Sequence, residues 1–235
     1  MTDLLPSPAL ANAADGMALL IESLRSGGFV MLLIVLCSFA AVSVGVITWL
    51  RLREKYLLPS GVVSQLRSLP TYAAKGDIAP LHRYLEQDGS MLARLGMLAV
   101  SGQHTTKQEC SEVVGQKARE ELHSLERDIP FLEVMVTVAP LLGLLGTTAG
   151  LVGMFSAFGE GGAGGPDTTA VAKEIGIALR CTIAGLFVAV PSVVAHTFFV
   201  RKLDAISMRV EYILQETINT FYQHFEVQRT NNSGH

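Results

Sequence analysis

The stretch VTVAPLLGLLGTTAGLVGMFSAF, residues 136–158, decides the fold of this chain. It contains no charged residue, and as a helix it is long enough to cross a bilayer core of about 30 Å. Gly143, Gly146 and Gly150 recur at helical spacing and leave gaps that a neighbouring backbone can enter. We therefore predict that these three glycines, with the adjacent Pro140, form a helix-packing face.

Two threonines, Thr147 and Thr148, lie in the middle of this stretch, where hydrocarbon offers no water to a hydroxyl. Such a hydroxyl either donates to a carbonyl one turn earlier or faces a polar path. An apolar, glycine-lined segment marked by threonine is typical of the wall of a conduit rather than of a simple anchor.

The composition excludes several classes of protein. With 49% hydrophobic residues in 235, the chain is too apolar for an ordinary soluble domain and too charged for a pure membrane bundle. A formal charge of −3 does not indicate a nucleic-acid partner. The cysteines Cys37, Cys110 and Cys181 are far apart, which favours neither a disulfide framework nor a zinc site, and we expect no cofactor.

Two further apolar segments complete the predicted fold, an all-α integral membrane protein with three transmembrane helices extended into a cytoplasmic helical domain. The first of them ends at Trp49, a residue type that prefers the membrane interface. In chain order we predict an outer amphipathic helix (1–27), transmembrane helix 1 (28–50), a cytoplasmic helical domain (51–129), transmembrane helix 2 (130–158), an outer loop (159–173), transmembrane helix 3 (174–200), and a C-terminal cytoplasmic helix and tail (201–235).

Basic residues orient these spans. Arg51, Arg53 and Lys55 directly follow the first span, and Arg201 and Lys202 follow the third. Because cytoplasmic loops carry an excess of Lys and Arg, we expect the N-terminus outside and the C-terminus in the cytoplasm of a bacterial inner membrane.

Two helices are expected outside the membrane. Residues 108–127 have the pattern of one long charged helix, and residues 203–227 carry an apolar stripe at 3–4 residue spacing. The stripe consists of Ile206, Val210, Ile213, Leu214, Ile218 and Phe221. Outside a membrane such a stripe needs a partner, which is either the 108–127 helix or another copy of the chain.

Two stretches together resemble the ExbB/TolQ/MotA proton-channel proteins, most closely the three-span ExbB/TolQ branch: residues 139–158, with the core motif LGLLGT at 142–147, and ALRCTIAGLFVAVP at 178–191. The resemblance implies a homopentamer around two helices of a single-span ExbD/TolR/MotB-like partner. A membrane aspartate of that partner would carry the proton. In these terms the chain is a channel subunit that couples the proton motive force to movement of the partner.

By motif position, the resemblance implies that Thr147 and Thr182 line the pore. Neither side chain titrates, so the titrating acid must come from elsewhere, which is the main reason to expect an obligate partner. The alternative is that both threonines only form hydrogen bonds between helices. ExbB and TolQ proteins commonly carry a glutamate five residues before the second threonine, and here that position is Ile177.

Two charged residues lie near the outer end of the third span. Glu174 either gathers cations at the outer mouth or is an ordinary interfacial charge. Arg180 either extends to the headgroups or contacts a neighbouring subunit; at 100° per residue it lies about 160° from Thr182, which argues against the pore.

Two polar residues are predicted at the inner end of the path. Glu133 precedes Thr147 by fourteen residues and His196 follows Thr182 by fourteen, so each lies near the same helix face as its threonine, about 21 Å away. We expect both at the same cytoplasmic depth, where they share a proton or simply satisfy the helix ends.

Two other function classes are alternatives to the proton-driven transducer. A non-conducting membrane scaffold that clamps a partner is compatible with the same packing features. An enzyme is not favoured, because no catalytic triad, metal-spaced cluster or phosphate-binding motif is found.

Overall fold

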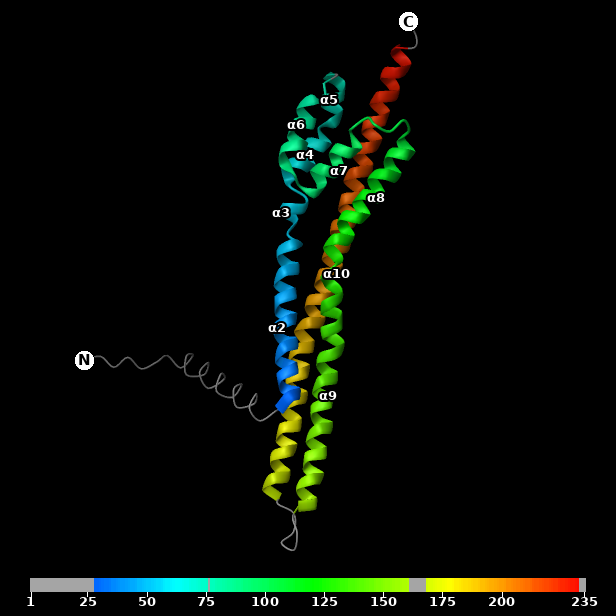
Figure 1. Cartoon of the computed structure of the whole chain (residues 1–235). Coiled ribbons are helices and arrows are strands. Elements are labelled where there is room, and N and C mark those ends of the chain that lie inside the picture. Colours follow the sequence, from blue (N-terminus) through cyan, green and yellow to red (C-terminus); the bar gives the residue numbers. More distant parts are fainter. Residues whose placement is uncertain (1–27, 76, 161–167, 233–235) are drawn as a thin grey trace, which may run out of the picture. The chain divides into compact units, whose positions relative to one another are not determined.

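The computed structural model describes residues 28–75, 77–160 and 168–232, and the regular elements in these ranges are all α-helices (Figure 1). They are α2 (Gly28–Arg51), α3 (Glu54–Leu57), α4 (Ser60–Arg67), α5 (Leu69–Lys75), α6 (Ala79–Asp88), α7 (Met91–Ala99), α8 (Lys107–Glu126), α9 (Ile129–Glu160) and α10 (Thr168–Asn232). The predicted all-α class is confirmed. The amphipathic helix predicted within 1–27 lies outside the described residues.

Three helical segments are long and apolar enough to cross a membrane. They belong to α2, α9 and α10, in agreement with the three predicted spans. The predicted charged helix over 108–127 is also confirmed, since α8 covers Lys107–Glu126.

The helix boundaries around the predicted outer loop differ from the prediction. α9 ends at Glu160 and α10 begins at Thr168, so both ends of the 159–173 segment are helical. Ala170, Ala172 and Lys173 are strong helix formers, although Lys173 is charged. Hydropathy marks where a helix becomes apolar, and a helix can begin well before that point.

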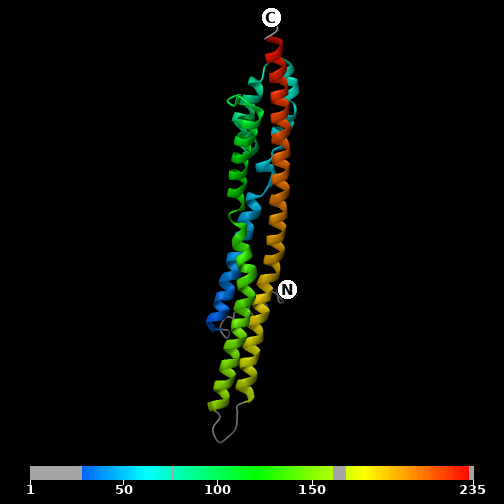
Figure 2. The same cartoon turned by 90° about the vertical axis from the view of Figure 1, so that its right-hand side faces the viewer.

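The chain divides into two compact units. Unit 1 comprises Met1–Val46 and Pro130–His196, and unit 2 comprises Ile47–Ile129 and Thr197–His235. In the described part of unit 1, α9 and α10 run antiparallel and side by side (Figures 1 and 2). Its buried core is small and joins three helices through Met31, Ile34, Ala139, Cys181, Val188 and Ala189. Many large apolar side chains of unit 1 remain exposed, as expected for surfaces that face lipid or other helices.

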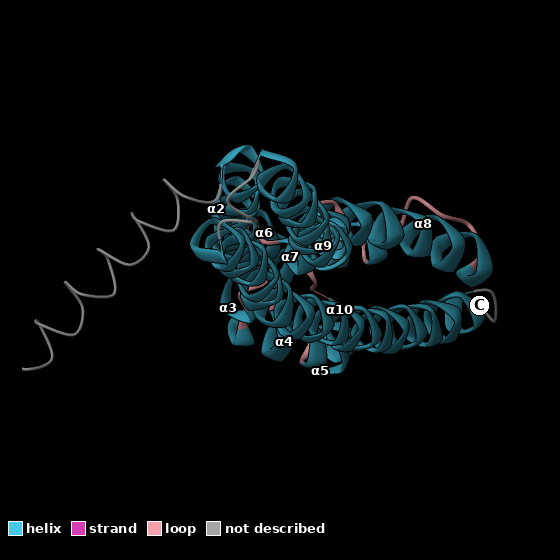
Figure 3. Ribbon diagram, turned by 90° about the horizontal axis from the view of Figure 1, so that it is seen from below, coloured by secondary structure: helices cyan, strands magenta, loops and turns pink. Residues whose placement is uncertain are grey.

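Unit 2 has an extensive hydrophobic core that includes the apolar stripe of α10. All six stripe residues on α10 are buried, together with Cys110, Val114 and Ala118 of α8 and with residues of α4, α6 and α7. Figure 3 shows α8 and the C-terminal half of α10 running along each other. The stripe is therefore covered within the chain, by α8 and the short helices of unit 2, which is the first of the two alternatives.

Local sequence signals set the short helices of unit 2. Pro59 precedes α4, and Gly89 ends α6 in the left-handed conformation with φ +63°. The Ser90 hydroxyl caps α7 by accepting from the Ala93 N–H at 3.2 Å. Thr106 caps α8 in the same way, accepting from the Glu109 N–H at 3.2 Å.

Candidate functional site in the α9–α10 interface

The backbones of α9 and α10 approach each other closely along a line of small residues in unit 1. A Cβ added to Gly143 would lie 3.1 Å from the Thr182 Cα, and one added to Gly150 would lie 3.1 Å from the Glu174 carbonyl oxygen. A Cβ on Gly146 would collide with Cys181. The three glycines predicted to pack helices thus all face α10, while Pro140 lies partly buried inside α9.

A further glycine of this line, Gly185 on α10, was not singled out from the sequence. A Cβ there would lie 2.6 Å from the Ala139 carbonyl oxygen and 3.1 Å from the Gly143 Cα. The signal was present, because Ala178, Cys181 and Gly185 repeat small residues at spacings of three and four.

Thr182 bridges the two helices. Its hydroxyl donates to the carbonyl oxygen of Gly143 at 3.2 Å. By contrast, the Thr147 hydroxyl donates within its own helix to the Leu144 carbonyl at 2.7 Å, and Thr148 donates likewise to Leu145 at 2.8 Å. Thr147 and Thr182 are partly buried and Thr148 is exposed.

The contacts between the helices fix their register. The facing pairs are Gly153–Glu174, Gly150–Ala178, Gly146–Cys181, Gly143–Thr182 and Ala139–Gly185. Because Gly143 is level with Thr182, Thr147 lies four residues from Thr182 along the axis, about 6 Å. The two threonines are therefore neighbours one turn apart, and no hydrogen bond joins them.

The same register corrects the expected depth of Glu133 and His196. Counting from Ala139 and Gly185, Glu133 is level with Pro191, so His196 lies five residues further along α10, about 7 Å. The pair is staggered by roughly one turn instead of lying at one depth. Glu133 is exposed and His196 is partly buried, and within the described chain no ion pair or hydrogen bond connects them.

The two charged residues near the outer end of the span in α10, Glu174 and Arg180, differ in their exposure. Glu174 is partly buried and its carboxylate points towards α9, with Oε2 2.8 Å from the position of a Cβ on Gly153. The absence of a side chain at Gly153 is what accommodates it. Arg180 is exposed and forms no ion pair with a described residue. Ile177 is partly buried.

The chemistry of this interface follows from its residues. The hydroxyls of Thr147 and Thr182 can form hydrogen bonds with water or a carboxyl group, but they do not titrate. Among the described residues, no group of three His, Cys, Asp or Glu side chains gathers as metal ligands would.

Comparisons with known proteins agree with this description. A family model described as "MotA/TolQ/ExbB proton channel family" matches residues 83–212, more than half of the chain. Over an aligned stretch of 83 residues, the chain is 35% identical to the biopolymer transport protein ExbB of Helicobacter pylori. This stretch covers 35% of the chain and 56% of the relative. Over 86 residues it is 38% identical to the Tol-Pal system protein TolQ of Haemophilus influenzae, covering 37% of each.

A longer match is to the putative biopolymer transport protein ExbB-like 3 of Synechocystis. Identity there is 30% over 148 residues, covering 61% of this chain and 69% of the relative. The matches to the Helicobacter and Haemophilus proteins span only about half, or less, of the length of those relatives.

The close approach at Gly185 predicts a sharp difference between two glycines of α10. Gly185→Ala places a methyl group against the backbone of Ala139, which cannot move aside as a side chain can. We expect a loss of about 1–3 kcal/mol of stability from overpacking, measured as a lower thermal unfolding midpoint of the detergent-solubilised protein. Gly176→Ala is the matched control, since nothing lies within 4 Å of its added Cβ. Equal midpoints for the two variants would contradict the described interface.

Proposed function

The chain belongs to the MotA/TolQ/ExbB proton channel family, and from this premise we propose that it is the channel subunit of an inner-membrane energy transducer. It is a multi-pass membrane protein with three spans. In the proposed transducer, proton flow through a ring of copies drives movement of a single-span ExbD/TolR/MotB-like partner.

The observation that carries the proposal is the α9–α10 interface. The hydroxyls of Thr182 and Thr147 lie within one helical turn of each other between two apolar helices. They lie next to main-chain atoms that the glycine residues leave uncovered. In the middle of these spans the chain has no carboxyl group of its own that could carry a proton. The carboxyl group is therefore assigned to the partner, in the form of an aspartate in its span.

The energy available is sufficient for mechanical work. A proton that falls through 100 mV releases about 2.3 kcal/mol. A carboxylate in the path is costly to expose to hydrocarbon, so its protonation state can bias the position of the helix that carries it. The proposed task of the ring is to permit discharge of this acid only when the partner's helices move.

The proposed orientation puts the N-terminus outside and the C-terminus in the cytoplasm of a bacterial inner membrane. The basic residues at and directly after the end of α2 support this orientation, namely Arg51, Arg53 and Lys55, as do Arg201 and Lys202 in α10. On this assignment, unit 2 is cytoplasmic.

A non-conducting scaffold remains the second candidate, and one observation favours it. The hydroxyls of Thr147, Thr148 and Thr182 all donate to carbonyls within the chain, so none requires a polar path. A scaffold would tolerate the loss of these hydroxyls as long as the helices still packed.

The proposed ring of copies can be tested by measuring the mass of the assembly. We expect native mass spectrometry of the detergent-extracted chain to show a homopentamer, because the exposed apolar faces of unit 1 and the family both favour assembly. A monodisperse monomer would be incompatible with the proposed channel.

The hydroxyls are tested by substitutions that keep side-chain shape. Thr147→Val and Thr182→Val should fold and assemble but lose most of the proton flux, measured with a pH-sensitive dye in vesicles that also contain the single-span neighbouring gene product. Thr182→Val should in addition cost about 0.6 kcal/mol, the typical value of a hydrogen bond between membrane helices. Thr182→Ser keeps the donor and should keep the flux.

Thr148→Val is the matched control for these variants, because its side chain points about 100° away from Thr147 on the same helix. We expect a milder effect. Flux lost equally at Thr147 and Thr148 would show that the face assignment is wrong. Full flux in all three valine variants would show that these hydroxyls do not line the path, and no flux even through the unsubstituted chain would favour the scaffold.

The inner end of the path is tested by a double-mutant cycle. Glu133→Gln and His196→Asn should each slow the flux several-fold without changing assembly. Glu133 and His196 are staggered by one turn, so a water must bridge them if they act on one proton. In that case the double variant should slow the flux little more than either single variant does. Fully additive losses would mean that the residues act independently.

A further inference from the structure

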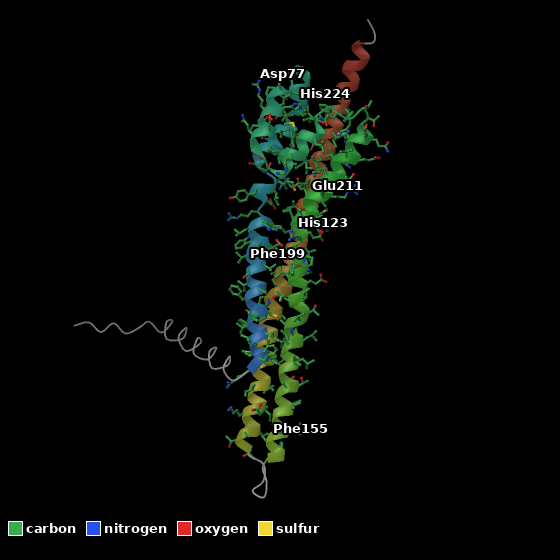
Figure 4. The ribbon with its side chains drawn as sticks, viewed as in Figure 1. Asp77, His123, Phe155, Phe199, Glu211 and His224 are labelled. Atoms are coloured by element: carbon green, nitrogen blue, oxygen red, sulfur yellow. The ribbon has the colours of Figure 1, made fainter. Side chains whose placement is uncertain are left out.

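The side chain of Glu174 lies across Gly153 in the α9–α10 interface of unit 1. A Cβ added to Gly153 would lie 2.8 Å from the Glu174 Oε2, 3.2 Å from its Cδ and 3.6 Å from its Cγ. A side chain at position 153 would therefore compete with the carboxyl group for the same space. Figure 4 labels Phe155, two residues beyond Gly153 and near the outer end of α9.

No group in the described part of unit 1 neutralises this carboxylate. Glu174 forms no ion pair and no hydrogen bond with a described residue. The facing segment of α9, residues 147–158, contains no charged residue, and neither do residues 28–46 of α2. On α10 itself, Lys173 and Arg180 lie about 100° and 120° away around the helix. A cation that joins the carboxylate therefore comes from solution.

The register of the helices places Glu174 beyond the outer end of the first span. Cys181 faces Gly146, and a Cβ on Gly146 would lie 3.5 Å from the Val30 Cγ1 of α2. These residues are level, and α2 begins at Gly28, about 3 Å further out. Glu174 precedes Cys181 by seven residues, so it lies about 7 Å beyond the start of α2, which Figure 1 shows ending short of α9 and α10. That is the depth of the headgroups and the outer water.

From this geometry we propose that Glu174 is the proton-entry residue of the channel subunit, and that Gly153 is the positioning residue that gives its carboxyl group room in the interface. The carboxylate takes a proton from the outer water and becomes a neutral carboxylic acid. It then releases this proton to water on the inner side, which restores the carboxylate. The inference rests on the channel proposed above and names the residue at which protons enter it.

The interface leads from Glu174 to the threonine hydroxyls. Thr182 lies eight residues further in along α10, about 12 Å, and about 80° around the helix from Glu174. It therefore lies on the flank of the contact with α9, and its hydroxyl oxygen can accept a hydrogen bond from water while it donates to the Gly143 carbonyl. Direct transfer over 12 Å is too long, so water on this flank carries the proton from Glu174 towards Thr182.

The orientation of Glu174 distinguishes it from an ordinary interfacial charge. A carboxylate that turns away from water loses hydration, which is costly unless something compensates for it. The neighbouring Lys173 follows the ordinary pattern and is exposed, whereas Glu174 is partly buried and turned towards α9. A residue that only solvated the helix end would not need the space that Gly153 leaves free.

The entry role is tested by measuring proton flux at different pH values on the outer side, in vesicles whose voltage is clamped with potassium and valinomycin. Glu174→Gln keeps the size of the side chain but cannot take up a proton. We expect it to lower the flux several-fold and to flatten the dependence of the flux on outer pH. Glu174→Asp keeps a carboxyl group and should keep most of that dependence. A role in packing alone would lower the thermal unfolding midpoint and leave the shape of the pH profile unchanged, which would overturn the inference.

Gly153→Ala tests the position of the carboxyl group separately from its presence. The added methyl group displaces the end of a flexible side chain and not a backbone, so the thermal unfolding midpoint should stay close to that of the unsubstituted chain. We expect a partial loss of flux, and no further loss when Gly153→Ala is added to Glu174→Gln, because both changes act through one carboxyl group. Gly176→Ala is the matched control and should leave the flux unchanged, since nothing lies within 4 Å of its added Cβ. Additive losses in the double variant would overturn the positioning role.

Failure of this inference can be distinguished from failure of the proposed function. Full flux with an unaltered pH profile in Glu174→Gln would overturn the entry role, while the channel would stand and protons would enter by another route. No flux through the unsubstituted chain would overturn the channel itself, and the entry role with it.

Discussion

Close approach of two backbones is the constraint on which unit 1 depends. In hydrocarbon the helices gain no hydrophobic energy from each other, so α9 and α10 must gain contact by packing and by hydrogen bonds. Glycine at 143, 146, 150 and 185 removes the side chains that would hold the two apart. The Thr182 hydroxyl then reaches a main-chain oxygen across the interface. The same glycines that permit packing also leave polar main-chain atoms uncovered between the two helices.

Much of this could be predicted from the sequence because the signals are local. Uncharged runs of about twenty residues identify spans, and charge at helical spacing identifies α8. The partner of the α10 stripe could not be predicted, because periodicity says that a face is buried but not which surface covers it. The burial of Val210 and Leu214 against α8 resolves that point. The start of α10 was missed for a related reason, since Lys173 is a charged residue and also a good helix former.

The candidate site was predictable in its residues but not in its register. Spacing along one helix places Glu133 near the face of Thr147, and His196 near that of Thr182. How far one helix slides along the other depends on which side chains meet, here Cys181 against Gly146 and Ala178 against Gly150. No pattern in a single sequence contains that information. The stagger of one turn in both pairs is thus a property of the packed interface.

The acceptor of the Thr182 hydrogen bond has a genetic consequence. A main-chain oxygen is present whatever residue occupies position 143, so no substitution there can delete the acceptor. Any residue larger than glycine would instead push the helices apart. Second-site suppressors of a Thr182 defect should therefore be absent from position 143 and arise elsewhere in the interface or in another protein. Over evolutionary time the two positions should vary little, and without the paired exchanges that are seen between two interacting side chains.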